Sequence, residues 1–300
     1  MTAMMPPNAD LSRSAILQLG RTAVVWWSPL QGQENVGDFL SFYFVNRLFR
    51  AARIQADVYR LVGSVITATR IRKDVEHIAR RNDARVAFWG CGCRDDEALP
   101  SDILAHASFH GVRGPLTRRV LGLPPDTPLG DPGLLLPLLY TPAVSERSRN
   151  RTIFVPHILD VLNKPQETLL QGSGADSLVS PIVENTPAAV ERFIDDICSA
   201  NFVLAGSLHA AIIACAYGVP FSFFDSGYID QPFKWRDFSA SIDTGTHFPR
   251  TRGDAEAVYD RFLKGRIRRP PLAPLLQAAP LEPRDDILAR ALTHAWPEAA

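Results

Sequence analysis

The sequence contains little cysteine and carries no net charge. Its four cysteines, Cys91, Cys93, Cys198 and Cys215, are too few and too widely spaced for a disulfide framework. Cys91 and Cys93 also lack the second pair of ligands that a structural zinc site requires. Lys plus Arg and Asp plus Glu both number 32, so no overall field favours nucleic acid or an anionic membrane. We therefore expect reduced thiols, no nucleic-acid partner, and local capture of any anionic ligand.

Long apolar runs and the common cofactor motifs are absent as well. The apolar stretch at residues 202–220 is interrupted by Ser207 and His209, and it falls short of the ~20 apolar residues of a membrane span. Asp10 and Arg13 lie where a signal peptide needs an unbroken apolar region. No HExxH, P-loop or GxSxG pattern occurs, so we expect no metal and no cofactor. These absences indicate a cytoplasmic protein, either free in solution or peripheral to the inner membrane.

Strands and helices alternate along the chain. Short apolar runs typical of strands occupy residues 23–27, 86–89, 153–155 and 202–204, and loops follow them. Helical patterns include residues 38–49 and 209–217. The alternation predicts an α/β fold with parallel sheets. Because such sheets bind ligands at the carboxyl ends of their strands, the loops after the strands are the candidate site elements.

The length of 300 residues and the hydrophobic content of 46% suit two domains. Residues 131–150 are rich in Pro, Ser and Arg, which is typical of a surface linker. We place the boundary there, with an N-terminal α/β domain at residues 1–145 and a C-terminal α/β domain at 146–268. Residues 269–300 form a Pro-rich linker and an amphipathic terminal helix, which we expect to pack back on the first domain.

Two loops in the first half carry candidate binding residues. Asn35-Val36-Gly37-Asp38 opens a helix, where Gly37 lets a ligand approach the backbone and free amides can hold an anion. Asp38 is alternatively a simple helix cap. Arg113, beside a glycine, can clamp a carboxylate or phosphate, or it can be a surface residue paired with an acid. Asp131 lies in a Gly-Asp-Pro-Gly turn, which indicates a backbone-positioning role.

Three segments in the second half carry candidate chemistry. Gly206-Ser207-Leu208-His209 ends a strand and begins a helix, so a hydroxyl and an imidazole lie beside free helix amides. The alternative is a capping serine next to a partly buried histidine. His157 follows another strand and faces the expected cleft, unless it is a loop residue without a role. Lys234 lies among aromatics in residues 233–238, which favours a small anion or a sugar as ligand.

Taken in order, these segments resemble the polysaccharide pyruvyl transferase family, especially the exopolysaccharide ketal pyruvyltransferases. The resemblance covers most of the chain and rests on eight short segments: WWSPLQGQENVGD (26–38), GSV (63–65), FWGCG (88–92), VRGPLT (112–117), GDPGLLLP (130–137), VPH (155–157), SLHAAIIACAYGVP (207–220) and FKWRDF (233–238). It implies two Rossmann-like domains arranged as in the GT-B glycosyltransferases. It further implies phosphoenolpyruvate as donor and a sugar hydroxyl pair as acceptor, on a lipid-linked oligosaccharide or another saccharide. The domain at residues 1–145 is expected to form the acceptor side and the domain at 146–268 the phosphoenolpyruvate side.

The resemblance also implies roles for individual residues. The family's phosphoenolpyruvate contacts fall on Arg113, Ser207, Leu208 and His209. Many members carry arginine where this chain has Ser207, so one donor cation is missing and Arg113 or Lys234 has to replace it.

The chemistry requires an acid, a base and an anion clamp. We predict His209 as the principal acid/base or phosphate-stabilising group, with Asp38 or His157 orienting or deprotonating the acceptor. The predicted donor-binding set is Arg113, Ser207, Leu208 and Lys234, and the predicted acceptor-binding or backbone-positioning set is Asn35, Gly37 and Asp131.

Two other functions fit the same sequence pattern. A nucleotide-sugar glycosyltransferase of GT-B architecture would bind a sugar nucleotide and make no use of phosphoenolpyruvate. A non-catalytic sugar-binding scaffold in polysaccharide assembly would bind ligand without turnover, and the missing arginine at Ser207 is its best support.

Overall fold

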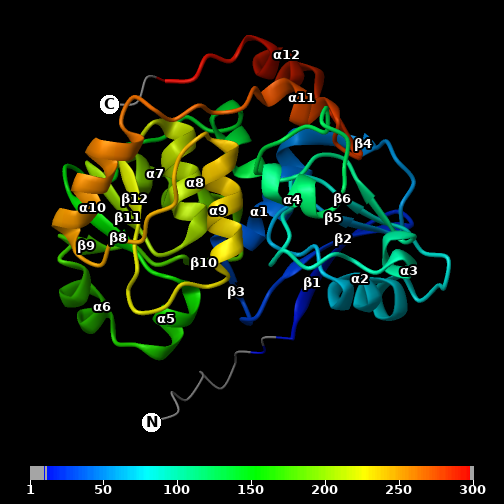
Figure 1. Ribbon diagram of the computed structural model, residues 1–300, viewed down its shortest axis with the longest axis horizontal. Coiled ribbons are helices and arrows are strands. Elements are labelled where there is room, and N and C mark those ends of the chain that lie inside the picture. The colour runs from blue at the N-terminus through cyan, green and yellow to red at the C-terminus, as the bar shows by residue number, and fades with distance from the viewer. Residues whose placement is uncertain (1–9, 11, 298–300) are drawn as a thin grey trace.

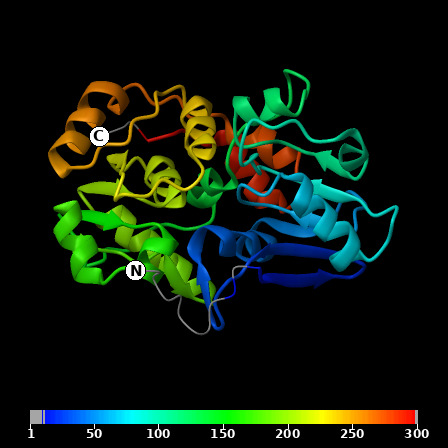
Figure 2. The same cartoon turned by 60° about the horizontal axis from the view of Figure 1, so that its bottom comes forward.

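The computed structural model describes residues 10 and 12–297. Two main β-sheets lie side by side, one built by the first part of the chain and one by the later part (Figure 1). Figure 2 shows the same two units from a second direction, with helices around each sheet. The fold is therefore α/β, as predicted.

The first sheet has the strand order β1-β2-β5-β6-β7. Its strands are β1 (Ser14–Leu19), β2 (Thr22–Trp27), β5 (Val58–Arg60), β6 (Val86–Phe88) and β7 (Ala107–Phe109). Strands β2, β5, β6 and β7 run parallel, whereas β1 pairs antiparallel with β2. The expectation of purely parallel sheets is wrong at this edge, because Gly20, with φ of 61°, forms a tight turn that folds β1 back on β2.

The second sheet has the order β12-β11-β8-β9, and all its strands are parallel. They are β8 (Thr152–Val155), β9 (Ser177–Leu178), β11 (Phe202–Ala205) and β12 (Phe221–Phe223). The central strands β8 and β11 are buried along their whole length. This burial explains why they read in the sequence as unbroken apolar runs rather than alternating ones.

Helices pack around both sheets. The helices of the first half are α1 (Val36–Leu48), α2 (Ala68–Lys73), η1 (Asp74–Ala79), α3 (Ser101–Leu104), α4 (Pro115–Val120) and the 3₁₀ helix η2 (Pro132–Leu138). Those of the second half are α5 (Ile158–Asn163), α6 (Gln166–Ser173), α7 (Pro187–Ser199), α8 (Leu208–Tyr217), α9 (Pro232–Ser241), α10 (Arg252–Val258), η3 (Tyr259–Leu263), α11 (Leu272–Gln277) and α12 (Asp285–Thr293).

One hydrophobic core cluster contains side chains of both sheets, α1, η2 and α8. Helix α8 is buried on nearly all sides, because its alanines allow close packing against η2 and β11. The expectation that residues 131–150 form a surface linker is wrong for their first part. Leu134, Leu135 and Leu136 are fully buried, because the leucines of η2 fill the space against α8.

Two short antiparallel ribbons join distant parts of the chain. Strand β3 (Gln33–Asn35) pairs with β10 (Ile182–Glu184), which links the two halves. Strand β4 (Phe49–Ala52) pairs with β13 (Leu281–Pro283), and Arg50 forms ion pairs with Glu282 and Asp285. The C-terminal segment thus returns to the first half, as expected, and carries α12 with it (Figure 1). Within the described residues, no helix combines the length and apolarity that crossing a membrane requires.

Candidate active site

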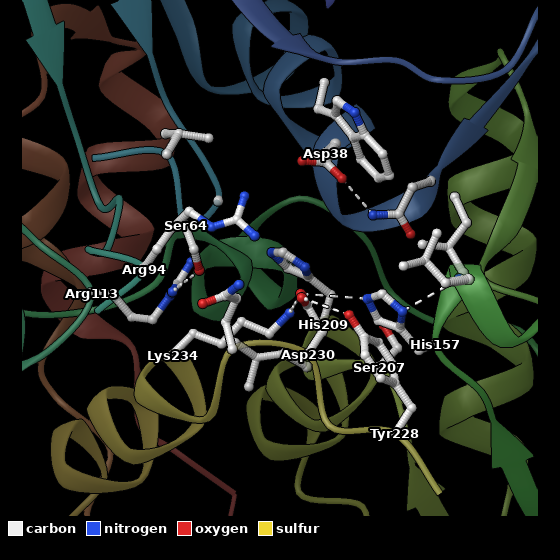
Figure 3. Close-up of a pocket in the computed structure, with 18 of the residues that line it drawn as sticks. Asp38, Ser64, Arg94, Arg113, His157, Ser207, His209, Tyr228, Asp230 and Lys234 are labelled. Atoms are coloured by element: carbon white, nitrogen blue, oxygen red, sulfur yellow. Dashed lines mark hydrogen bonds and ion pairs between the residues drawn. The ribbon is translucent and has the colours of Figure 1, made fainter. Parts of the chain in front are cut away.

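A cavity of about 330 Å³ lies between the two halves of the molecule. Its walls come from the segments after β2, β5, β6 and β7 on one side and from those after β8, β11 and β12 on the other (Figure 3). The predicted residues among its lining are Asn35, Asp38, Arg113, His157, Ser207, Leu208, His209 and Lys234. The structure therefore brings together eight side chains that are scattered over about 200 positions of the sequence. The two remaining predicted residues, Gly37 and Asp131, lie directly behind His209 and Arg113.

Five helices begin at this cavity. The first turns or N-caps of α1, α2, α5, α8 and α9 all contribute lining residues. Neither Asn35 before α1 nor Ser207 before α8 caps its helix through the side chain. The uncapped amides and the positive ends of the helix dipoles therefore favour negative charge at this position.

Arg113 is fully buried and only partly paired. Its Nε donates to Asp131 Oδ2 at 2.9 Å and its Nη1 donates to Ser64 Oγ at 2.7 Å. Its Nη2 is buried without a hydrogen-bond partner among the described residues. The alternative of a surface arginine is wrong, because Asp131 and Ser64 hold the guanidinium inside the fold. One donor thus remains for a ligand.

The Gly90–Cys93 turn packs against Arg113. The Arg113 amide donates to the Cys91 carbonyl at 3.0 Å, and a Cβ at Gly92 would lie 2.7 Å from Arg113 Nη1. Burial raises the pKa values of Cys91 and Cys93 to about 12, so both remain neutral thiols. Both side chains belong to the hydrophobic core of the first half.

His209 packs directly against the backbone of α1. A Cβ added to Gly37 would lie 2.0 Å from His209 Nδ1, so only glycine fits there. His209 Nε2 is buried without a hydrogen-bond partner among the described residues, and Asp131 Oδ1 lies 4.0 Å away. Burial, together with the charges of Arg113 and Lys234, lowers the pKa of His209 to about 4. The imidazole is therefore neutral at pH 7 in the free protein.

Asp38 is the third residue of α1 rather than its cap. The helix begins earlier than the sequence suggests, at Val36, and Asn35 is the N-cap residue. Asn35 Nδ2 donates to Asp38 Oδ2 at 2.5 Å. Burial raises the pKa of Asp38 above its ordinary value, so this carboxyl keeps its proton to higher pH than a solvated aspartate.

His157, Asp230 and Lys234 form a second polar group in the cavity (Figure 3). His157 Nδ1 accepts the Leu159 amide at 3.3 Å, so the ring proton lies on Nε2, which faces Asp230 Oδ2 at 3.6 Å. Lys234 Nζ forms an ion pair of 2.5 Å with the same oxygen. Burial alone would raise the pKa of Asp230, but His157 and Lys234 hold it well below its usual range. Asp230 therefore orients both side chains and stays ionised.

The sequence patterns did not indicate several lining residues, among them Ser64, Arg70, Arg94, Tyr228 and Asp230. Arg94 directly follows the Gly-Cys-Gly-Cys turn, and Asp230 precedes Lys234 by four residues. These spacings were the available signals, but neither forms a recognisable motif. Among residues 10 and 12–297, no three His, Cys, Asp or Glu side chains are grouped to hold a metal ion.

The fold is α/β, and its cavity brings a buried arginine and several helix N-termini together with Asp38 and two histidines. A comparison with family models matches residues 35–228 to "Polysaccharide pyruvyl transferase". The chain belongs to this family and is an enzyme of polysaccharide pyruvyl transfer, as the resemblance predicted. The family match decides against the glycosyltransferase and the non-catalytic scaffold.

A curated relative is the succinoglycan biosynthesis protein ExoV of Rhizobium meliloti (strain 1021). It is 27% identical over 242 residues, which cover 79% of this chain and 71% of the relative. No solved structure is significantly similar to the chain.

Proposed function

We propose that the protein transfers pyruvate from phosphoenolpyruvate to a sugar of a bacterial exopolysaccharide or of its lipid-linked precursor. The products are a cyclic pyruvate ketal and inorganic phosphate. Similarity to a succinoglycan biosynthesis protein supports an exopolysaccharide acceptor. With this function we propose a GT-B-like pair of Rossmann-like domains, at residues 1–145 and 146–268, and a cytoplasmic place of action, free or at the inner membrane.

One observation carries the choice of donor. Arg113 Nη2 and His209 Nε2 are buried nitrogens without partners in a cavity where the uncapped first turns of α1 and α8 meet. An unpartnered buried polar atom is costly. A bound anion would accept hydrogen bonds from Arg113 Nη2 and the helix amides, and a substrate hydroxyl would donate to His209 Nε2. Phosphoenolpyruvate has a phosphate and a carboxylate a few bonds apart, which suits several donors placed around one small cavity.

The opposite pKa shifts of Asp38 and His209 support an acid and base assignment. Asp38, whose pKa is raised by burial, is the group we assign to protonate the methylene carbon of phosphoenolpyruvate, and C2 becomes oxocarbenium-like. A first sugar hydroxyl adds to C2 as neutral His209 accepts its proton. The second hydroxyl then displaces phosphate, and its proton leaves with the phosphate as HPO₄²⁻. One hydroxyl proton thus replaces the proton that Asp38 gave to the methyl group.

His157 fits orientation better than proton abstraction. Both of its ring nitrogens are engaged, Nδ1 with the Leu159 amide and Nε2 with Asp230. We assign His157 and Lys234 to one wall of the donor site, with Lys234 supplying charge and Asp230 fixing both side chains.

The test is acceptor-dependent phosphate release from phosphoenolpyruvate, with ketal formation read by mass. The purified protein is offered galactosyl, mannosyl and glucosyl acceptors, both synthetic and lipid-linked. Replacing an acid/base group costs roughly 10²–10⁴-fold in rate, so His209→Gln and Asp38→Asn should each lose at least 100-fold. The matched control is His77→Gln, because His77 is exposed and lines neither cavity.

Wild-type protein that neither binds phosphoenolpyruvate in calorimetry nor releases phosphate would refute the donor assignment. Phosphate release that His209→Gln leaves unchanged would refute the role of this residue but not the donor.

A further inference from the structure

A second cavity, of about 600 Å³, adjoins the first and lies wholly on the side of the first sheet. The two cavities share four lining residues, Ser64, Val65, Arg70 and Arg94. The remaining lining of the second cavity comes from Ser12, residues 66–69, Lys73, Asp95 and residues 97–100. It therefore lies beside the loops that follow β5 and β6, where parallel sheets bind ligands.

The two cavities differ in the chemistry of their walls. The first is dominated by Arg113, Lys234 and helix N-termini, which suit a small anion. The second carries hydroxyls, carboxylates and cations together with apolar surface from Ile66, Ala68 and Leu99. Paired donors and acceptors around apolar patches fit a molecule with many hydroxyls and apolar ring faces.

Three side chains of the second cavity have polar groups free for a ligand. Arg94, the Glu97 carboxylate and the Thr69 hydroxyl have no hydrogen bond or ion pair to any part of the chain that the structure describes. A carboxylate accepts two hydroxyl hydrogens and a guanidinium donates several hydrogen bonds in a fixed plane. Together, the Glu97 carboxylate and the Arg94 guanidinium can form hydrogen bonds with neighbouring hydroxyls of a pyranose.

The two cavities meet at their shared lining residues, close to the proposed donor site. In Figure 3, Ser64 and Arg94 lie on the side of the donor cavity opposite His157. Ser64 accepts from Arg113 Nη1, and Asp38 Oδ1 would lie 3.6 Å from a Cβ at neighbouring Gly63. A hydroxyl reaching across Ser64 from the second cavity would therefore enter beside both the anion clamp and the proposed acid.

We propose that the second cavity holds the saccharide acceptor, with Arg94, Glu97 and Thr69 contacting its hydroxyls. This assignment rests on the proposed pyruvyl transfer and adds where the second substrate binds. Arg94 lies between the two substrates, whereas Glu97 and Thr69 line the acceptor cavity alone.

The experiment measures the KM for phosphoenolpyruvate and for the best acceptor of the panel separately. Thr69→Trp fills the cavity from an exposed position, and Glu97→Gln removes the charge at nearly constant size. Each should raise the acceptor KM about tenfold and leave the calorimetric Kd for phosphoenolpyruvate within twofold. Arg94→Lys should raise both the acceptor KM and the Kd for phosphoenolpyruvate. The control is Glu76→Gln, because Glu76 is exposed and outside both cavities.

An unchanged acceptor KM in both Thr69→Trp and Glu97→Gln would overturn the cavity assignment while phosphate release stands. A wild-type protein without phosphoenolpyruvate binding or turnover would overturn the proposed function, and with it this inference. Unchanged circular dichroism and an unchanged Kd for phosphoenolpyruvate in the variants show that folding does not explain the result.

Discussion

Burial of neutral His209 should make the stability of the protein fall as pH falls. The unfolded chain binds a proton at this residue with an ordinary pKa of 6.5, whereas burial lowers the folded value to about 4. Between these values the unfolded state holds more protons, so stability rises with pH across this window and is lost on acidification. From pH 7.5 to pH 5.0 the linkage expression gives a loss of about 2 kcal/mol.

The assay is urea unfolding of wild type and His209→Gln at several pH values between 5.0 and 7.5. The variant lacks the titrating group, and the packing change it introduces is independent of pH. Wild type should therefore lose about 2 kcal/mol more than the variant over this range. Other groups, including Asp38, titrate in both proteins and cancel in the difference. His77→Gln, at an exposed position, should follow the wild type. Parallel curves for wild type and His209→Gln would refute the claim that this imidazole is buried and neutral.

Further predictions concern the cavity and its supports. Phosphoenolpyruvate brings negative charge beside His209 and should raise the pKa of this imidazole, so its binding at pH 6 should be accompanied by proton uptake. Calorimetry in buffers of different ionisation enthalpy measures the number of protons taken up, and this number should fall to zero in His209→Gln. Gly37→Ala places a Cβ 2.0 Å from His209 Nδ1 and should reduce turnover by about 100-fold. The control Gly172→Ala, with open space around it, should keep the wild-type rate. Equal turnover in the two variants would contradict the close packing of Gly37 against His209. Asp237→Ala leaves the amides of Leu116 and Thr117 without their acceptor and should cost about 2–3 kcal/mol in urea unfolding; a change under about 0.5 kcal/mol would contradict the capping role.

Local patterns predicted the elements whose burial is uniform. The apolar runs at residues 23–27 and 202–204 became β2 and β11 with boundaries shifted by one residue. Strand β1 was missed, because it is an edge strand with only partly buried side chains and depends on a turn at Gly20. Residues 131–138 were misjudged, because proline and leucine content does not distinguish an exposed linker from a 3₁₀ helix that becomes buried by packing on α8.

The candidate site was predictable where a residue lies next to a strand end or a helix start. Asp38, Arg113 and His209 occupy such positions, and all three line the cavity. Arg70 and Asp230 were not predicted, because their approach to the cavity depends on how the two halves pack. Whether an arginine such as Arg70 has an acidic partner depends on the tertiary structure, and local sequence spacing does not predict it.

The distribution of charge in the cavity bears on the expected absence of an arginine at Ser207. Arg113 forms an ion pair with Asp131, and Lys234 forms one with Asp230. Arg94 lines the same cavity without an acidic partner among the described residues, so it supplies a cation that no internal carboxylate cancels. A guanidinium without an internal carboxylate partner adds net positive charge at the ligand, whereas an ion-paired arginine adds less net charge and still donates directed hydrogen bonds. We therefore propose that Arg94, from the first half of the chain, supplies the cation expected from Arg113 or Lys234, and that Arg113 orients the anion.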